Sequence, residues 1–351
     1  AETDAAAFLA LGWADAEDRL WQLELHRRTA QGGLAELFGA RALPVDRTMR
    51  ALDLAGFARA AVDHQSEAAL AVLEAYAAGV NARIRTVNAE ALGRGAPEFF
   101  LFGSGGLAPW TPSDSLSVIK LMALRMSSAA RLEARRARLP AHVGPEKLAD
   151  LDPAYPDRGM IALPSFSELY DTITFPAERA EVTSPFSPLP EPGMGGASNA
   201  WAVATNRAAS DAPLLATDPH LWLSAPSVWY LARLSSPGYD VIGGTIPGIP
   251  AVLIGRNARF GWGLTTAHVD DQDLYIERLD PDDPSRYRTP EGWAPFEMRR
   301  ETIRVAGGAS ETLTLRRSRH GPVMPPGADL DFSSVTPAGH VVALAWTALT
   351  A

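Results

Sequence analysis

The sequence has 351 residues, of which 46% are hydrophobic and 21% are charged. This composition is typical of a globular protein and excludes a disordered or collagen-like chain. At about 150 residues per domain, the length fits two or three domains or one large one. The net charge of −9 disfavours a general nucleic-acid-binding protein, and the absence of cysteine excludes disulfides and thiolate metal sites. Because no apolar run approaches about 18 residues, we expect no membrane span.

The first 138 residues are predicted to be mainly helical. Apolar residues recur at helical spacing near the start. The Gly32–Gly33 pair should interrupt this pattern, because glycine pairs mark breaks. In chain order we expect a long Ala-rich helix over 66–92, a Gly- and Pro-rich loop over 93–112, and a helix after Pro112, capped by Ser113 or Asp114, that runs to about Arg138.

Residues 139–197 are rich in Pro, Ser and Glu and show little periodicity, which predicts a linker or an exposed excursion. From Ser198 the pattern changes to the period of two that is typical of strands, in SNAWAVAT, YDVIGG, AVLIGR, LYIERL, ETIRVA and ETLTLRRS. Helices followed by strands indicate an α+β fold.

The two ends of the sequence suggest a piece of a longer protein. The sequence opens AETDAAAFLALGW without Met and is helical almost at once, and it closes VVALAWTALTA inside a strand-like run. We therefore expect further residues on both sides.

The junction GMGGASNAWAVA is the candidate chemical centre. If the Ala197–Ser198 bond were cut, Ser198 would gain an α-amine with a pKa of about 7.7–8.0, close to the value that suits a general base near neutral pH. One residue would then supply both nucleophile and base. A Gly-rich approach to a strand is also a common surface loop, so this pattern alone leaves both interpretations open.

Several motifs in order resemble the penicillin acylase family of N-terminal-nucleophile (Ntn) amidases, which self-cleave before Ser-Asn-x-Trp. The resemblance covers nearly the whole sequence and implies a four-layer αββα sandwich with a largely helical α-chain. It divides the chain into an α-chain-like region over 1–138, a spacer over 139–197 and the start of the β-chain over 198–351. The motifs are ALGWADAEDRLWQLELHRRTAQGGLAELFG, APEFFLFGSGGLAPWTPSDSL, SNAW, ATDPHL, GYDVIG, GWGLTTAHVDDQDLYIERL and RHGPVM.

The resemblance makes Ser198 the nucleophile and Ala197–Ser198 the cleavage site. It places His220 where relatives have Gln or His beside the nucleophile; a buried structural histidine is the alternative. The backbone of Thr266, or of Ala267, would donate to the oxyanion, and such a donor is worth about 3–4 kcal/mol in acyl transfer. A second donor, an Asn side chain with an Arg near it, would lie beyond this sequence.

Asp270, Asp271 and Asp273 crowd three carboxylates into four residues. Oxygen ligands suit a hard cation such as calcium, although acidic clusters also occur as solvated turns. By resemblance, one structural calcium would be held by Asp270, the carbonyl of Gln272 and Asp273, with Glu133 from the α-chain.

The same resemblance assigns an acyl pocket. Its apolar lining would accept an aromatic or aliphatic acyl group, and Leu221 stands where phenylacetyl-selective members have an aromatic residue. Ordinary core packing is the alternative for each residue, and the stronger one for the two Ile. The candidate lining is Met122, Arg125, Met126, Leu221, Ile246 and Ile254.

The resemblance therefore predicts an amide hydrolase whose α- and β-chains form a heterodimer, exported to the periplasm or secreted. Its substrate would be a small-molecule amide such as a β-lactam antibiotic. Acylases of N-acyl-homoserine lactones or cephalosporins share this mechanism. An unprocessed or incomplete, calcium-stabilised binding or scaffold domain is the alternative of another class. A classical Ser-His-Asp hydrolase is a weaker third possibility, because the sequence has no G-x-S-x-G elbow.

Overall fold

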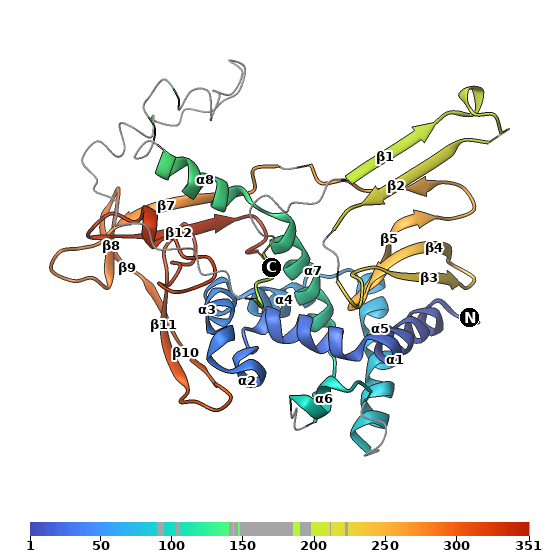
Figure 1. The fold of residues 1–351 in the computed structure, drawn as a ribbon, viewed down its shortest axis with the longest axis horizontal. Helices are drawn as coiled ribbons and strands as arrows, with labels where there is room; N and C mark the ends of the chain where they lie inside the picture. Colours follow the sequence, from blue (N-terminus) through green and yellow to red (C-terminus); the bar gives the residue numbers. More distant parts are fainter. Residues whose placement is uncertain are drawn as a thin grey trace.

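Helices fill the first part of the chain and strands follow from Ser198, which confirms the α+β class (Figure 1). The computed structural model describes residues 1–89, 95–102, 106–139, 143, 147, 185–189, 198–210, 212–221, 224–267 and 269–350. Most of the predicted spacer, including Ala197, lies outside the described residues. The helices are α1 (Asp4–Gln31), α2 (Ala35–Phe38), η1 (Gly39–Ala42), α3 (Leu43–Leu52), α4 (Leu54–Val62), α5 (Glu67–Ala89), α6 (Glu98–Leu101), α7 (Pro112–Met126), α8 (Ala129–Arg138), η3 (Thr205–Arg207) and η4 (Ser333–Val335).

The ends of α1 follow from its sequence. Thr3 caps its first turn, because the Thr3 hydroxyl accepts the Ala6 N–H at 3.1 Å. Gly32 ends it in the left-handed region, with φ of 62°, which glycine adopts without steric cost. The predicted break at Gly32–Gly33 is confirmed, and α5 confirms the long Ala-rich helix as far as Ala89.

Two helical predictions were wrong in detail. The helix expected from Pro112 to Arg138 divides into α7 and α8, because Ser127 adopts an extended backbone between them. The cap of α7 is Thr111, not Ser113 or Asp114; Asp114 completes a capping box by accepting the Thr111 N–H. The predicted loop over 93–112 also contains the short helix α6.

Each described strand pairs with the strand beside it in an antiparallel ladder. All six strand-like segments predicted from sequence are confirmed. The described strands form one four-stranded sheet, in the order β3-β4-β5-β6, and the pairs β1–β2, β7–β12, β8–β9 and β10–β11. The four-layer sandwich stays a prediction for the whole protein. The strands are β1 (Ser198–Val203), β2 (Leu214–Pro219), β3 (Tyr230–Ser235), β4 (Asp240–Ile246), β5 (Ile249–Arg256), β6 (Gly261–Trp262), β7 (Gln272–Arg278), β8 (Arg286–Thr289), β9 (Gly292–Pro295), β10 (Glu297–Ile303), β11 (Glu311–Arg317) and β12 (His340–Trp346).

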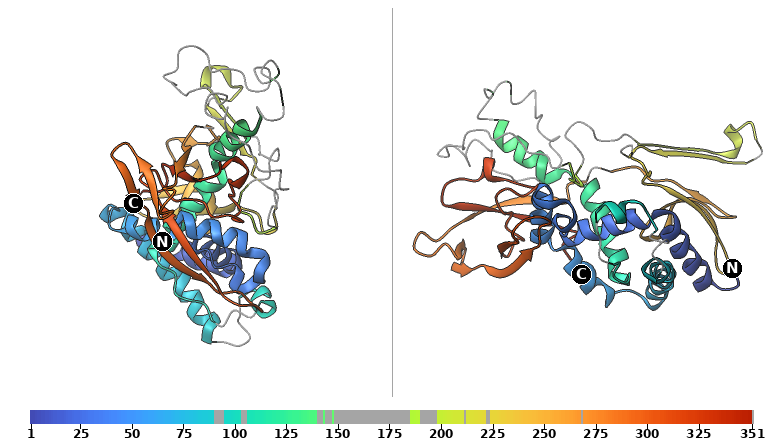
Figure 2. Two further views of the ribbon diagram at one scale, coloured as in Figure 1. Left: turned by 90° about the vertical axis from the view of Figure 1, so that its left-hand side faces the viewer. Right: turned by 60° about the horizontal axis from the view of Figure 1, so that its bottom comes forward.

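The strands gather at the two ends of the molecule, with helices between them (Figures 1 and 2). In the β1–β6 region, strands β3, β4 and β5 share a core with α1 and α5, which includes Leu23 and Tyr76. The β7–β12 region shares another with α3, α4 and α8, which includes Leu52 and Leu344. Helix α7 contributes to both cores, through Val118 to the first and through its neighbours Leu121 and Leu124 to the second. The middle of the molecule is thus one helical layer between two sets of strands.

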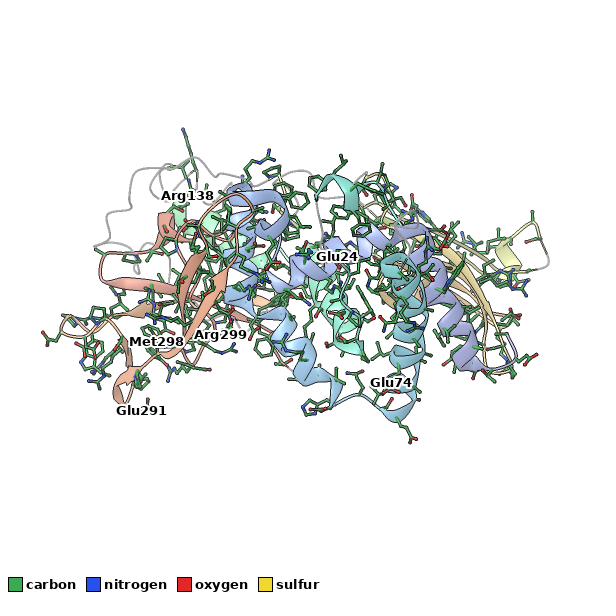
Figure 3. All side chains as sticks on the ribbon, turned by 90° about the horizontal axis from the view of Figure 1, so that it is seen from below. Glu24, Glu74, Arg138, Glu291, Met298 and Arg299 are labelled. Atoms are coloured by element: carbon green, nitrogen blue, oxygen red, sulfur yellow. The ribbon has the colours of Figure 1, made fainter. Side chains whose placement is uncertain are left out.

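Charged side chains tie the helices to β10 and β11. Arg47 of α3 makes a bidentate pair with Glu311, with both N–O distances at 2.7 Å. Arg299 of β10 pairs with Asp53 at the start of α4. Glu24, near the centre of the molecule in Figure 3, pairs instead with Arg28 of its own helix. The first two contacts join distant parts of the chain and fix β10–β11 on the helical layer.

Candidate active site

Ser198 is the first residue of β1 and is half-buried. Strand β1 pairs with β2 so that Ser198 lies opposite Pro219 and Asn199 opposite Asp218. The predicted strand start at Ser198 is confirmed. This register places the candidate nucleophile at one end of a hairpin, directly beside the DPH motif.

His220 follows β2 and is exposed. Its Nε2 lies 3.0 Å from the carboxylate of Asp218. Among the described residues, His220 thus contacts Asp218 and not Ser198. His220 therefore lies at the same end of the hairpin as Ser198. A contact between His220 and Ser198 stays a prediction.

The segment after β6 lies against the same hairpin. A methyl group added at Gly263 would come within 2.7 Å of the Thr217 side chain, so the backbone at Gly263 passes directly over β2. The Thr217 hydroxyl is buried there and has no hydrogen-bond partner among the described residues. Thr266, three residues further on, is half-buried. The close approach at Gly263 thus carries the predicted oxyanion segment toward the strands of Ser198.

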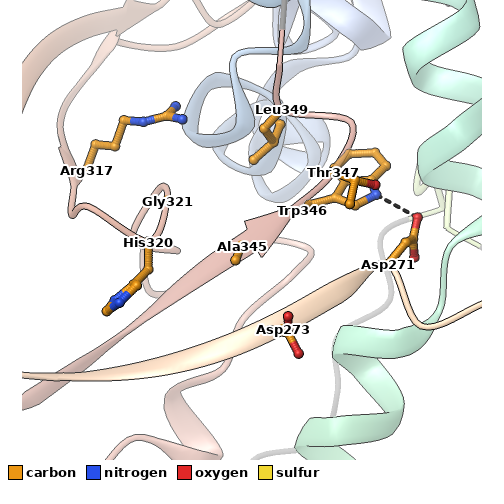
Figure 4. A pocket seen from close by; sticks show the side chains of 9 residues that line it. All are labelled: Asp271, Asp273, Arg317, His320, Gly321, Ala345, Trp346, Thr347 and Leu349. Atoms are coloured by element: carbon orange, nitrogen blue, oxygen red, sulfur yellow. Dashed lines mark hydrogen bonds between the residues drawn. The ribbon is translucent and has the colours of Figure 1, made fainter. Parts of the chain in front are cut away.

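The acidic segment fastens β7 to the joint between α7 and α8. Asp271 accepts the Ser127 hydroxyl at 2.8 Å and the Trp346 indole N–H at 2.9 Å (Figure 4). The buried Gln272 side chain accepts the Ala130 N–H at 3.1 Å, at the start of α8. These contacts explain the break between the two helices, because Ser127 turns toward Asp271 instead of continuing α7.

Glu133 of α8 faces the same segment and accepts the Leu274 N–H at 2.7 Å. The pKa of Glu133 is raised to about 7, mainly by burial and in part by the nearby Asp273 and Asp270, while the Leu274 N–H and Arg136 act in the opposite direction. Glu133, the α-chain residue that the resemblance suggests, therefore lies beside the acidic segment. Within the described residues, however, no three His, Asp or Glu side chains converge closely enough to hold a metal ion.

The residues assigned to the acyl pocket lie on α7, on the segment after β2, and on β4 and β5. Met122 on α7 is buried, and Leu221 packs against the same cluster. The Arg125 guanidinium lies 3.7 Å from the Met122 sulfur, and burial lowers the pKa of Arg125 to about 10. Ile254 is half-buried on β5, Ile246 is buried on β4, and Met126 is exposed.

Sequence reasoning missed a group of buried polar residues beneath the β4–β5 turn. Tyr76 of α5 donates to Asp15 of α1 at 2.6 Å and accepts the Gly248 N–H at 2.8 Å. Burial raises the pKa of Asp15 to about 7. His26 is buried against the Pro247 carbonyl, and burial lowers its pKa to about 3. Only the three-dimensional packing identifies these residues, because they come from separate elements.

A pocket of about 280 Å³ lies beside β7 and β12 (Figure 4). Asp271, Arg317 and Trp346 are among its lining residues, and Ser198, His220 and Thr266 are not. In the close-up, His320 and Asp271 lie on opposite sides of it. The Nδ1 atom of His320 lies 2.7 Å from the carboxylate of the buried Glu277, and the His320 ring stacks on Tyr275. This pocket is therefore separate from the hairpin that carries the candidate nucleophile.

A helical half followed by a strand that begins at a serine is the organisation expected of an Ntn-hydrolase precursor. The profile of the penicillin amidase family, described as penicillin amidase, matches residues 1–351, and the chain belongs to this family. This match confirms the resemblance that the motifs indicate.

Curated relatives in the family have names of two kinds. Over 91% of the chain, it is 34% identical to acyl-homoserine lactone acylase QuiP of Pseudomonas aeruginosa, of which it covers 37%. Over 96% of its length, the chain is 33% identical to the penicillin acylase 2 proenzyme of Pseudomonas sp. strain SE83. Over 90% of its length, it is 27% identical to penicillin G acylase of Escherichia coli. It covers 43% of each of these two relatives. The chain thus spans about two fifths of the length of these relatives.

In the described part of the chain, no helix combines the length and the apolar character needed to cross a bilayer.

Proposed function

We propose that the protein is an amide hydrolase that cleaves itself between Ala197 and Ser198 and then uses Ser198 as its nucleophile. The observation that carries this proposal is the position of Ser198 as the first residue of a strand in a chain of the penicillin amidase family. Cleavage there would leave the serine at the new chain end, held in place by the β1–β2 ladder.

Ser198 would act as the nucleophile in two reactions, first in self-cleavage and then in hydrolysis of the amide substrate. In self-cleavage, the Ser198 hydroxyl attacks the Ala197 carbonyl carbon, and the peptide C–N bond breaks as an ester forms, which frees the Ser198 α-amine. Water then hydrolyses the ester to the Ala197 carboxylate and the Ser198 hydroxyl. In the amidase reaction, that amine, with a pKa of about 7.7–8.0, takes the hydroxyl proton and passes it to the leaving amine. Water then hydrolyses the acyl ester. His220 would orient the hydroxyl or amine, since imidazole can donate and accept.

The oxyanion would be stabilised by the backbone N–H at Thr266. Support comes from Gly263, whose close approach to Thr217 brings this segment to β2. Preorganised donors are usually the largest single contribution to such reactions. Ala267 is the alternative donor.

The acyl group would enter between α7 and β5, against Met122, Arg125, Met126, Leu221 and Ile254. Met122 and Leu221 already share one core cluster, which supports a continuous apolar lining. The names of the relatives favour two amide classes, N-acyl-homoserine lactones and penicillins. Comparing hydrolysis of a fatty-acyl-homoserine lactone with that of phenylacetyl- and cephalosporin-type amides would separate them.

We also propose a structural calcium held by Glu133, Asp270, the carbonyl of Gln272 and Asp273. The raised pKa of Glu133 supports it, because a cation would relieve the repulsion and burial that produce this shift. Calcium should raise the melting temperature of the wild-type protein and bind in calorimetry. Both effects should be lost in Glu133→Gln but kept in Glu74→Gln, an exposed carboxylate on α5. Equal responses from the two variants would exclude this site.

The mature protein would be an α/β heterodimer acting on a small-molecule amide in the periplasm or outside the cell. The decisive test is intact mass and N-terminal sequencing of the purified protein beside a Ser198→Ala variant. We expect pieces of 197 and 154 residues, the second beginning Ser-Asn-Ala-Trp, and a single uncut chain for the variant. An uncut wild-type chain would refute the mechanism and favour a non-catalytic, calcium-stabilised binding or scaffold domain.

A further inference from the structure

Residues 224–230, which we call the connecting loop, lead into β3 and lie against the middle of α1. The Arg19 guanidinium donates to the Ser227 carbonyl at 3.2 Å, and the Gln22 side-chain amide donates to the same oxygen at 3.4 Å. A carbonyl oxygen has two lone pairs, so it can accept both hydrogen bonds. One turn of α1 therefore holds one peptide group of the connecting loop with two side chains.

Helix α1 is irregular at the residue that makes this contact. Arg19 has φ of −136° and ψ of 22°, outside the helical region, although α1 contains no proline that would break it there. The Arg19 guanidinium also lies 5.7 Å from the centroid of the Tyr230 ring, a cation–π contact. The Tyr230 hydroxyl donates to the Asp18 carboxylate at 2.7 Å. The irregular turn is thus the one that reaches the connecting loop, at Ser227 and again at Tyr230.

The other side of the connecting loop lies beside the proposed acyl pocket. A methyl group added at Gly244 would lie 3.0 Å from the Trp229 ring and 3.0 Å from the Ile254 side chain, so these two side chains meet over the same glycine. Val228 is buried in the core cluster that also contains Met122. The connecting loop therefore joins α1 to the surroundings of Ile254 and Met122, both assigned to the pocket.

We propose that Arg19 and Gln22 are positioning residues for the acyl pocket, which act through the Ser227 carbonyl and the connecting loop. This inference rests on the proposed function, because the pocket is that of the proposed amidase. After cleavage before Ser198, α1 and the connecting loop would lie on different polypeptides, so the α-chain would fix one side of a pocket in the β-chain. A bulky acyl group that packs on this side depends on its position, whereas an acetyl group is too small to do so.

The acyl selectivity of the processed enzyme tests the positioning role. Arg19→Met removes the hydrogen bond and the cation–π contact. It should raise KM about tenfold for the better-hydrolysed of the phenylacetyl and decanoyl amides, and less than about twofold for the matching acetyl amide, with kcat nearly unchanged. Arg19→Lys keeps a cationic donor and should restore KM to within about threefold of wild type, and Gln22→Leu should raise it about threefold. Arg85→Met, at an exposed position of α5, is the matched control and should change neither KM.

The outcomes separate positioning from folding and from the proposed function. Intact mass and thermal melting of each variant show whether it is cut and folded. Equal rises in KM for the bulky and the acetyl amide in a cut, folded Arg19→Met enzyme, or no rise for either, would overturn the positioning role and leave Ser198 as the nucleophile. If Arg19→Met does not fold, an unchanged KM of Gln22→Leu for the bulky amide overturns it instead. A wild-type chain that is not cut, or that hydrolyses no amide, would refute the proposed function, and the positioning role would fall with it.

Discussion

The hairpin β1–β2 and the pair β7–β12 are both two-stranded and antiparallel, yet their surroundings differ. In β12, Leu344 is fully buried, and helix α8 contacts β7. Among the described residues of the hairpin none is buried: Trp201 is 65% exposed and Leu214 is 52% exposed. The same secondary structure is thus part of a core at one end of the molecule and an accessible surface at the other.

The difference shows that strand pairing and burial contribute separately to the stability of a strand pair. An isolated hairpin is marginally stable in water, and most of its stability must come from packing. The β7–β12 pair obtains that packing from the helical layer and from the contacts of Asp271 and Gln272. The hairpin that carries Ser198 depends on its edge contact with the β6 segment at Gly261 and Gly263. Local opening should therefore be easier at the candidate nucleophile than anywhere in β12.

The largest expected effect comes from the same substitution at each end. Leu344→Ala should lower the free energy of unfolding by about 2–5 kcal/mol, because it removes buried methyl groups and leaves a cavity. Leu214→Ala, in the exposed hairpin, should change it by about 0.5 kcal/mol or less. Urea unfolding followed by circular dichroism would measure both. Similar losses for the two variants would show that the hairpin is buried in solution, contrary to the comparison.

The second prediction concerns Asp15, beneath the sheet of the β1–β6 region. Burial raises its pKa to about 7, and Asp18 raises it slightly, while the Tyr76 hydroxyl, the Gly248 N–H and Arg19 lower it. The folded protein therefore binds the Asp15 proton more tightly than the unfolded chain does. The stability that this proton contributes is complete below about pH 4 and is lost as the pH rises through about 7. The total change is at most about 4 kcal/mol.

Asp15→Asn should remove this dependence, because the amide oxygen can still accept from Tyr76 and carries no charge. The measurement is the free energy of unfolding at pH values from 5 to 8, where we expect a fall in the wild-type protein and a flatter profile in the variant. Asp283→Asn is the control, since hydrogen bonds from the Ser285 hydroxyl and N–H lower the pKa of this exposed carboxyl instead of raising it. A parallel fall in wild-type protein and Asp15→Asn would show that another group titrates.

Sequence reasoning found what depends on local pattern. The start of β1 at Ser198, the break at Gly32–Gly33 and the long Ala-rich helix follow from turn residues and periodicity, which act over a few positions. The order of motifs was enough to identify the family. It could not show which partner a side chain takes across the fold. Asp271 and Ser127, which form a hydrogen bond, are 144 positions apart. The helical pattern of 112–138 does not indicate that Ser127 interrupts the helix to make this contact.

The candidate site shows the same limit. The motif identified His220, but its partner Asp218 follows from how the side chain turns at the end of β2. Likewise, Asp15, Tyr76 and His26 read as ordinary helix positions, since only the turn at Pro247–Gly248 brings them together. Burial was equally hidden: Trp201 has the strand pattern of a core residue and is exposed. Each of these properties depends on long-range packing, which a single sequence does not display.

The smallest expected effect tests the edge contact that joins the hairpin to the β3–β6 sheet. In Gly263→Ala the added methyl group would lie 2.7 Å from the Thr217 side chain, so β2 and the segment leading to Thr266 must move apart. We expect a loss of about 1–3 kcal/mol, as for other overpacking changes, and faster amide exchange in β1 and β2. Gly308→Ala, near the β10–β11 hairpin, is the matched control, because its methyl group meets only Val305 at an ordinary distance of 3.4 Å. Exchange that accelerates equally in both variants, or in neither, would mean that the close approach at Gly263 does not hold the Ser198 hairpin in place, and the oxyanion donor would have to be sought on another segment.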